Sequence, residues 1–170
     1  DFNRGDNEGC GYFEVNQKAG VRWNTAKAFL RPAAGRSNLE IWTHAQALGL
    51  TIDGRRCTGV RLRREGRDLV LGARREVILA AGAIGSPHLL QLSGIGPGDL
   101  LQAHGLEVRH ALPGVGQNLQ DHLQIRTVFK VANVTTLNER ANSLWHKGLM
   151  GLEYALFRKG PLSMAPSQLG

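Results

Sequence analysis

The fold is decided by residues 76–94, Glu76-Val77-Ile78-Leu79-Ala80-Ala81-Gly82-Ala83-Ile84-Gly85-Ser86-Pro87-His88-Leu89-Leu90-Gln91-Leu92-Ser93-Gly94. After Glu76, residues 77–82 form a continuous apolar run, which is typical of a strand covered on both faces. Ser86-Pro87 predicts a helix start, because Ser caps helices well and Pro suits the first helical position. Gly94 predicts the end of that helix. A buried strand, a small-residue turn and a helix together indicate a nucleotide-binding α/β fold.

Upstream of this stretch, the sequence predicts an antiparallel β-meander. Strands are expected at 47–52, 58–63 and 68–72, where apolar and β-branched residues recur. Asp53-Gly54 and Glu65-Gly66 separate them, and both dipeptides are typical of hairpin turns.

Shorter patterns predict the remaining elements. Asn24 is expected to cap a helix that ends near Leu30 or Arg31, because Pro32 follows. Residues 39–43 alternate in a way that favours a strand. Downstream we expect a helix at 99–104, a strand at 106–112, a loop at 113–119, β structure at 123–131, and a helix at 143–159 within a helical hairpin or lid.

The composition excludes several classes of protein. The 170 residues include 42% apolar side chains and a formal net charge of +7, which is ordinary for a globular protein and not for a disordered, collagen-like or membrane-spanning one. The basic residues form scattered pairs interrupted by acidic residues, whereas a nucleic-acid surface is typically a continuous basic stripe. We therefore expect no nucleic-acid partner.

The two cysteines, Cys10 and Cys57, suggest neither a disulfide framework nor a zinc site, because they lie far apart with no C-x-x-C partner. Lone thiols favour a reducing compartment, so the expected location is the cytoplasm, with attachment to the inner membrane as the alternative. The histidines show no metal-ligand spacing, and no metal site is expected.

Two glycine-rich stretches, 94–99 and 114–119, imitate a dinucleotide-binding fingerprint. The first follows a predicted helix and contains Pro97, and the second has Leu119 where the last Gly belongs. The fingerprint requires three glycines between a buried strand and a helix. Both stretches are therefore interpreted as structural turns.

Residues 82–96 resemble the second signature of the glucose-methanol-choline (GMC) flavoprotein oxidoreductases. That signature combines a small-residue turn, Ser-Pro, an aliphatic pair and Ser-Gly-aliphatic-Gly at the spacings found here. Residues 24–32, 36–41 and 113–122 are similar to further family segments, so the resemblance covers nearly the whole chain. Within the family, the chain is most similar to bacterial choline dehydrogenase-like alcohol dehydrogenases.

The resemblance implies an α/β fold in two parts. Residues 1–121 would be the middle of a FAD/NAD(P)-binding, Rossmann-like domain that includes the meander, and 122–170 the start of an α+β substrate-binding domain. The chain would then be an internal part of a larger enzyme. Its partners would be the remaining N- and C-terminal parts of that enzyme.

The activity implied by the resemblance is oxidation of a primary alcohol to an aldehyde, with hydride passing to FAD. The acceptor would be oxygen, a quinone or a dye. In the family, the Gly-rich fingerprint lies before the matched region and the catalytic His lies near the C-terminus, so no residue of this chain is expected to be catalytic. Isolated, the chain is expected to be inactive and to hold FAD weakly.

Three residues are candidate cofactor contacts. The resemblance places a main-chain contact to the adenine at Ala47. Ala81 and Gly82 end the apolar run, where a bare backbone permits close approach to FAD; simple packing is the alternative. The tail, 160–170, is expected to approach the active site.

His122 follows Asp121, but side chains of sequence neighbours in an extended segment point to opposite faces. We expect a structural His at the domain boundary and no catalytic Asp-His pair. A non-catalytic nucleotide-fold or interaction module is the alternative function for the whole chain.

Overall fold

The computed structural model describes residues 8–123, 125 and 128–165. It divides into two compact units, each described by itself. Ile41–Arg126 is called the meander unit here, and Asp1–Glu40 together with Thr127–Gly170 is called the terminal unit. Helices and strands are mixed in an α/β arrangement, as the sequence predicts.

The meander is confirmed. Strands β3 (Ala45–Asp53), β4 (Arg56–Arg64) and β5 (Arg67–Gly72) form one antiparallel sheet in chain order. The turns contain Gly54 and Gly66, both at positive φ, which glycine adopts without steric cost. The register of β3 against β4 shifts in two places, with an extra residue in β3 at Leu48 and an extra residue in β4 at Thr58.

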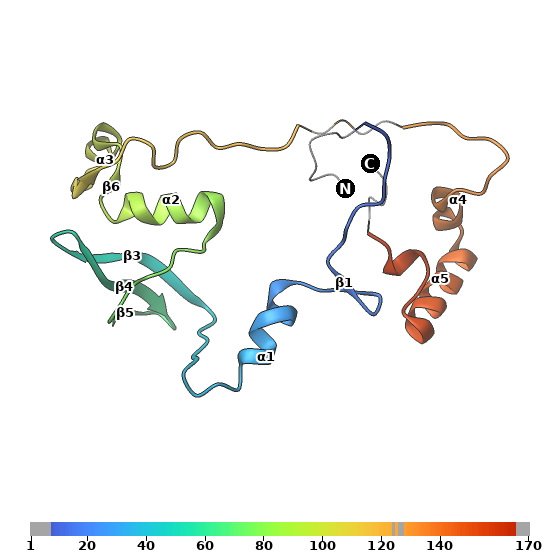
Figure 1. Cartoon of the computed structure of the whole chain (residues 1–170), viewed down its shortest axis with the longest axis horizontal. Helices are drawn as coiled ribbons and strands as arrows, with labels where there is room; N and C mark the ends of the chain where they lie inside the picture. The colour runs from blue at the N-terminus through green and yellow to red at the C-terminus, as the bar shows by residue number, and fades with distance from the viewer. Residues whose placement is uncertain (1–7, 124, 126–127, 166–170) are drawn as a thin grey trace. The chain divides into compact units, whose positions relative to one another are not determined.

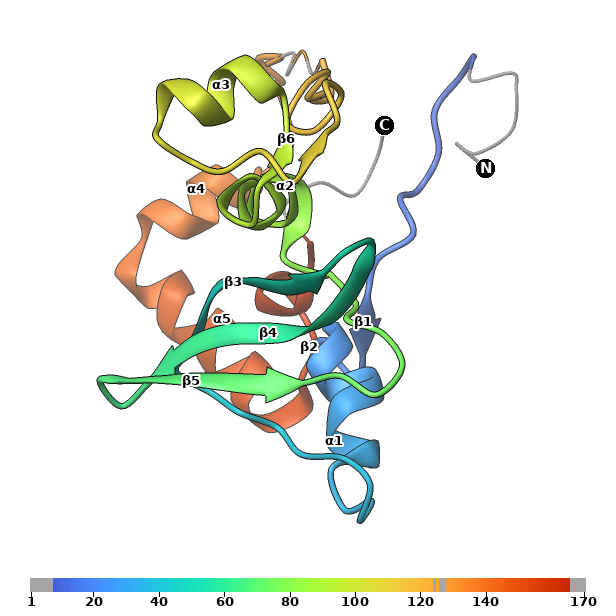
Figure 2. The same ribbon diagram turned by 90° about the vertical axis from the view of Figure 1, so that its left-hand side faces the viewer.

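Helix α2 (Gly82–Leu92) packs over β3; Figure 1 shows the helix from the side, and Figure 2 shows it nearly end-on above β3, which runs across the view. A two-stranded parallel sheet follows, made of β6 (Ile95–Gly96) and β7 (His110–Ala111), with α3 (Gly98–Ala103) between them. The core of the unit consists of buried aliphatic side chains. These are Leu62, Leu89, Leu101 and Val115.

Around α2, two predictions are wrong. Residues 76–81 form no strand, and Ile78 is 79% exposed, because a strand needs neighbouring strands and none pairs with this run among the described residues. The helix begins at Gly82, so Pro87 lies inside it. Ser86 does act at this helix start, since its Oγ accepts the Ala81 N–H at 3.0 Å.

Further strands are shorter than predicted. Residues 39–43 carry no strand, and the Leu39 N–H instead donates to the Arg36 carbonyl in a turn. Of 106–112, only β7 is paired. The described residues among 123–131 form no strand, and the others lie outside the described residues. The loop at 113–119 and the helix closed by Gly105 are confirmed.

The terminal unit begins with a small hairpin, β1 (Gln17–Lys18) and β2 (Val21–Arg22). The helix that follows is a π-turn, η1 (Ala26–Leu30), continued by α1 (Arg31–Ala33). It therefore ends two or three residues beyond the predicted limit, because Pro32 is accommodated in the first turn of α1. The cap is confirmed, since Asn24 Oδ1 accepts the Lys27 N–H at 3.0 Å.

The C-terminal half of this unit is a helical hairpin, as predicted. Helix α4 (Leu137–Asn142) has a capping box between Thr136 and Glu139, and α5 (Leu144–Phe157) begins after Ser143. A 3-10 turn, η2 (Pro161–Ser163), follows. Among the described residues, no helix is both long and apolar enough to cross a bilayer.

Candidate functional site

Ala81 and Gly82 lie at the N-terminal end of α2, where both are exposed. Gly82 has φ +83°, and a Cβ built on it would meet no atom within 4 Å. The first N–H groups of a helix have no partner within the helix and favour anions, so this end is open to a phosphate-bearing group. Its exposed, bare backbone fits close approach of a dinucleotide.

Ala47 lies on β3, immediately before the register shift that separates it from Gly49. It is exposed. A bulge leaves backbone groups outside the regular ladder, so main-chain atoms here are suited to contact a ligand. The structure thus places Ala47 on the strand next to α2, while Ala81 and Gly82 lie at the start of α2. Their contact with a cofactor stays a prediction.

Ser93 fixes α2 to β3. Its hydroxyl donates to the Leu89 carbonyl at 2.6 Å and accepts the Leu50 N–H at 2.8 Å, and the residue is buried. The Leu50 N–H lies beyond the bulge, so Ser93 satisfies a donor near the irregular part of the strand. This Ser of the signature is therefore structural, and it positions both candidate cofactor segments.

The glycine-rich stretches act as turns and close contacts, as the sequence predicts. Gly94 has φ +82°, and a Cβ there would lie 2.5 Å from the Glu107 carbonyl oxygen. Gly116 has φ +81° and lies against the Gln91 side chain, whose amide donates to the Val115 carbonyl at 3.2 Å. Gln91 thus ties α2 to the loop at 113–119.

His122 makes no pair with the Asp121 side chain through its ring. The Asp121 carboxylate instead accepts the His122 backbone N–H at 2.8 Å. Within the described ranges, no three His, Cys, Asp or Glu side chains come close enough to hold a metal ion. Cys10 is exposed and Cys57 half-buried, and both are free thiols.

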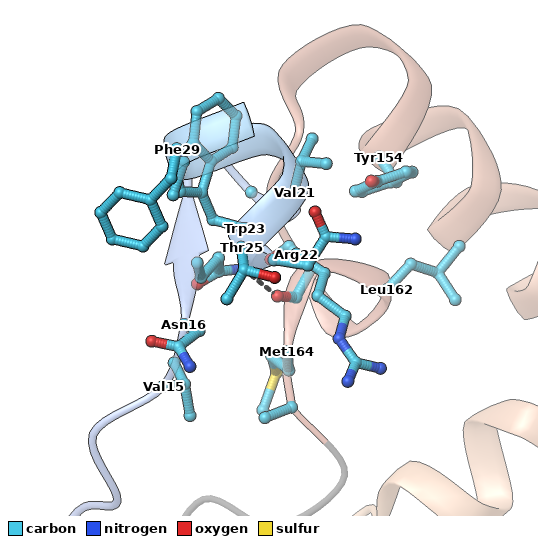
Figure 3. A pocket seen from close by; sticks show the side chains of 16 residues that line it. Val15, Asn16, Val21, Arg22, Trp23, Thr25, Phe29, Tyr154, Leu162 and Met164 are labelled. Atoms are coloured by element: carbon cyan, nitrogen blue, oxygen red, sulfur yellow. Dashed lines mark hydrogen bonds between the residues drawn. The ribbon is translucent and has the colours of Figure 1, made fainter. Parts of the chain in front are cut away.

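The terminal unit contains a large open pocket of about 1040 Å³ (Figure 3). One wall comes from the β1–β2 hairpin and η1, and the other from α5 and the segment around η2. Its apolar and aromatic lining is Val15, Val21, Trp23, Ala28, Phe29, Tyr154, Leu162, Met164 and Ala165. The Gln17 side-chain amide donates to the Ser163 carbonyl and so joins the two walls.

Arg22 is the charged residue that lines this pocket. Figure 3 shows its guanidinium extending toward the side formed by Leu162 and Met164. The structure gives this guanidinium no hydrogen-bond or ion-pair partner among the described residues, although the Arg22 carbonyl accepts from Lys27 Nζ at 2.9 Å.

The sequence offered only a weak signal for this pocket. The described residues 162–165 of the tail line this pocket, whereas an approach of the tail to an active site stays a prediction. The hairpin at 17–22 could not be expected from hydrophobic pattern, since each of its strands has two residues. Ala19 and Gly20 adopt positive φ angles in its turn, and Gly20 is the one local signal that could have indicated a turn here.

Comparison with known curated proteins gives consistent matches. The chain is 41% identical over 160 residues to "Oxygen-dependent choline dehydrogenase" of Brucella anthropi, which is 94% of this chain and 29% of the relative. It is 40% identical over 173 residues to "Alcohol dehydrogenase [acceptor]" of Pseudomonas putida, covering 100% of this chain and 31% of that protein. The chain therefore spans about 29–31% of the length of these relatives.

Solved structures share the fold. A FAD-dependent oxidoreductase from Chaetomium thermophilum superposes with a TM-score of 0.84 at 26% identity, over 95% of this chain and 29% of that one. A fungal aryl-alcohol oxidase gives a TM-score of 0.83 at 24% identity, covers 97% of this chain and 29% of that chain, and supports the fold alone. The GMC oxidoreductase family description matches residues 1–124, well over half of the sequence. With relatives of about 40% identity along its whole length, this chain belongs to the GMC oxidoreductase family, as part of a longer protein of that kind.

Proposed function

We propose that the protein containing this chain is a FAD-dependent oxidoreductase that oxidises a primary alcohol to an aldehyde, similar to choline dehydrogenase. The main support is the near-complete match to relatives named choline dehydrogenase and alcohol dehydrogenase. FAD is the cofactor in the name of a solved structure that this chain superposes on. When bound, the flavin accepts the hydride, and the protein positions the substrate.

The described residues fit such a cofactor. Ala47, Ala81 and Gly82 offer exposed main chain on neighbouring elements, which are the groups we propose to meet FAD. Ser93 holds these elements together through a buried hydroxyl. The proton-accepting His is proposed to lie elsewhere in the enzyme, so this chain contributes binding and orientation.

We propose residues 1–121 as part of the FAD-binding domain and 122–170 as the start of the substrate-binding domain. The family match supports this boundary, since it ends at residue 124.

The test is an assay of the purified intact protein. Flavin absorbance should show bound FAD, and anaerobic addition of a primary alcohol should bleach it as the aldehyde forms. Choline, simple alcohols, sugars and polyethylene glycols should be compared, with oxygen, a quinone or a dye as acceptor. Absence of both bound flavin and alcohol oxidation would instead favour the non-catalytic module.

A further inference from the structure

We propose that the pocket of the terminal unit binds an apolar chain that ends in a carboxylate, with Arg22 holding the carboxylate. If the protein oxidises alcohols, as the proposed function on which this inference rests states, its substrate is an alcohol that also carries a carboxylate. Choline, which is named in one group of relatives, is a cation, whereas the ligand proposed here is an anion.

The walls of the pocket suit an apolar chain. The pocket volume of about 1040 Å³ is at the upper end of the range that encloses organic ligands. Three apolar side chains at its border are left largely uncovered, with Phe29 73%, Leu162 55% and Met164 49% exposed. Covering such surface with a hydrocarbon chain removes it from water, which is favourable.

The polar groups of the pocket favour an anion. Asn24 already accepts a backbone N–H, and Gln17 and Ser163 donate to backbone carbonyls. The guanidinium of Arg22 is left without a partner in the part of the chain that is described. No acidic side chain lines the pocket among the described residues. A guanidinium binds a carboxylate through two parallel hydrogen bonds, so this is the group it recognises best.

The aromatic rings of the pocket are poorly suited to a quaternary ammonium group. Such a cation binds over aromatic faces. Here Lys18 Nζ already lies 5.1 Å from the centre of the Trp23 ring, and Arg158 lies 5.0 Å from that of Tyr154. Lys18 and Arg158 do not line the pocket themselves, but each occupies a ring that does, and the one charged lining side chain among the described residues, Arg22, would repel a ligand cation.

The first experiment measures binding to the intact, FAD-loaded protein by calorimetry. The probes are hexanoate, hexanol and hexyltrimethylammonium, which share one chain and differ in charge. We expect hexanoate to bind most tightly and Arg22→Met to weaken it by about tenfold or more, since a charge-assisted pair is lost. Hexanol binding should change by less than about twofold, which also shows that the variant is folded.

Two further variants sharpen the result. Arg22→Lys should keep part of the preference for hexanoate, because it keeps the charge and loses the paired geometry. Lys147→Met, on an exposed part of α5 outside the pocket, removes the same charge and should leave binding unchanged. Equal hexanoate affinity in the parent protein and Arg22→Met, tighter binding of hexyltrimethylammonium, or no hexanoate binding would each overturn the proposal.

The second experiment measures turnover of ω-hydroxyhexanoate, hexanol and choline. We expect the highest kcat/KM for the hydroxy acid and loss of that preference in Arg22→Met, mainly through KM. An enzyme that oxidises choline best would overturn the inference while leaving the proposed function intact. A protein that binds hexanoate through Arg22 but oxidises no alcohol would contradict the proposed function and keep the binding site.

Discussion

Two polar side-chain interactions join elements of the meander unit, and one is buried while the other lies at the surface. Ser93 is buried and bridges α2 and β3 through two hydrogen bonds. Arg63 and Asp68 instead form an exposed ion pair across β4 and β5, with Nε to Oδ1 at 2.6 Å. Removing a hydrogen-bond partner lowers the free energy of unfolding more when the group left behind is buried than when it is exposed. The two sites should therefore respond differently to substitution.

Replacing Ser93→Ala should destabilise the contact of α2 with β3 by about 1–3 kcal/mol, because the half-buried Leu50 N–H would lose its acceptor. Hydrogen exchange of peptides from β3 and α2 in the intact protein measures this. Ser37→Ala, at an exposed position with no such bond, should leave exchange unchanged. Unaltered protection around residue 50 in Ser93→Ala would contradict the bridging role.

The hydrogen bond from Arg63 lowers the pKa of Asp68 below its ordinary value. Because the pKa of Asp68 is lowered in the folded state, the pair contributes to folding stability at neutral pH. That contribution is lost as the pH falls through the folded-state pKa. Arg63→Met should raise the pKa of Asp68 toward the ordinary value, as followed by NMR titration of selectively labelled aspartate. Because both side chains are solvent-exposed, the effect on thermal stability should be small. An unchanged titration of Asp68 would show that the pair does not form in solution.

At the scale of elements, glycines decide how α2 and α3 end. Gly94 and Gly105 each follow a helix and adopt positive φ, +82° and +68°. Their surroundings differ, because a Cβ at 94 would meet the Glu107 carbonyl at 2.5 Å while one at 105 would meet nothing within 4 Å. The pair separates the cost of the backbone angle from the cost of a steric clash.

We expect Gly105→Ala to lower the local free energy of unfolding by about 1–2 kcal/mol, which is the cost of a left-handed backbone angle. Gly94→Ala should lower it by about 2–4 kcal/mol, because the steric clash adds to that cost. Hydrogen exchange of α2 and α3 reports each change locally, which avoids assuming that a multidomain protein unfolds in one step. If both variants lowered the protection from exchange by the same amount, the inferred clash of a residue-94 Cβ with the Glu107 carbonyl would be wrong.

At the scale of the whole molecule, many apolar side chains are left uncovered. On α5, Leu144 is 85% exposed and Leu156 64%, although the amphipathic pattern predicts that this face packs against a core. The chain spans about 29–31% of its relatives' length, and large apolar patches mark surfaces that pack against other parts. The elements therefore form the proposed cofactor and substrate surfaces without enclosing them.

The isolated 170-residue chain should consequently bind FAD far below one equivalent and turn over no alcohol. Flavin absorbance after gel filtration, compared with that of the intact protein prepared in parallel, measures this. Stoichiometric flavin on the isolated chain would contradict the expectation, and would show that the exposed backbone at residues 81–82 and 47 suffices for tight binding.

The sequence by itself determined the family, the meander and the caps at Asn24 and Ser143, because these depend on local spacing, turn chemistry and helix capping. Tertiary structure decided the rest. Residues 76–81 are apolar enough for a buried strand but pair with none of the described residues, since strands form only with neighbours. In the sequence, Ser93 was a signature position with no stated role, and Arg22 belonged to no motif. Ser93 became a buried bridge, and Arg22 lines a pocket without a side-chain partner among the described residues. Only folding brings together segments more than a hundred residues apart, such as 17–22 and 162–165, which form the two walls of that pocket.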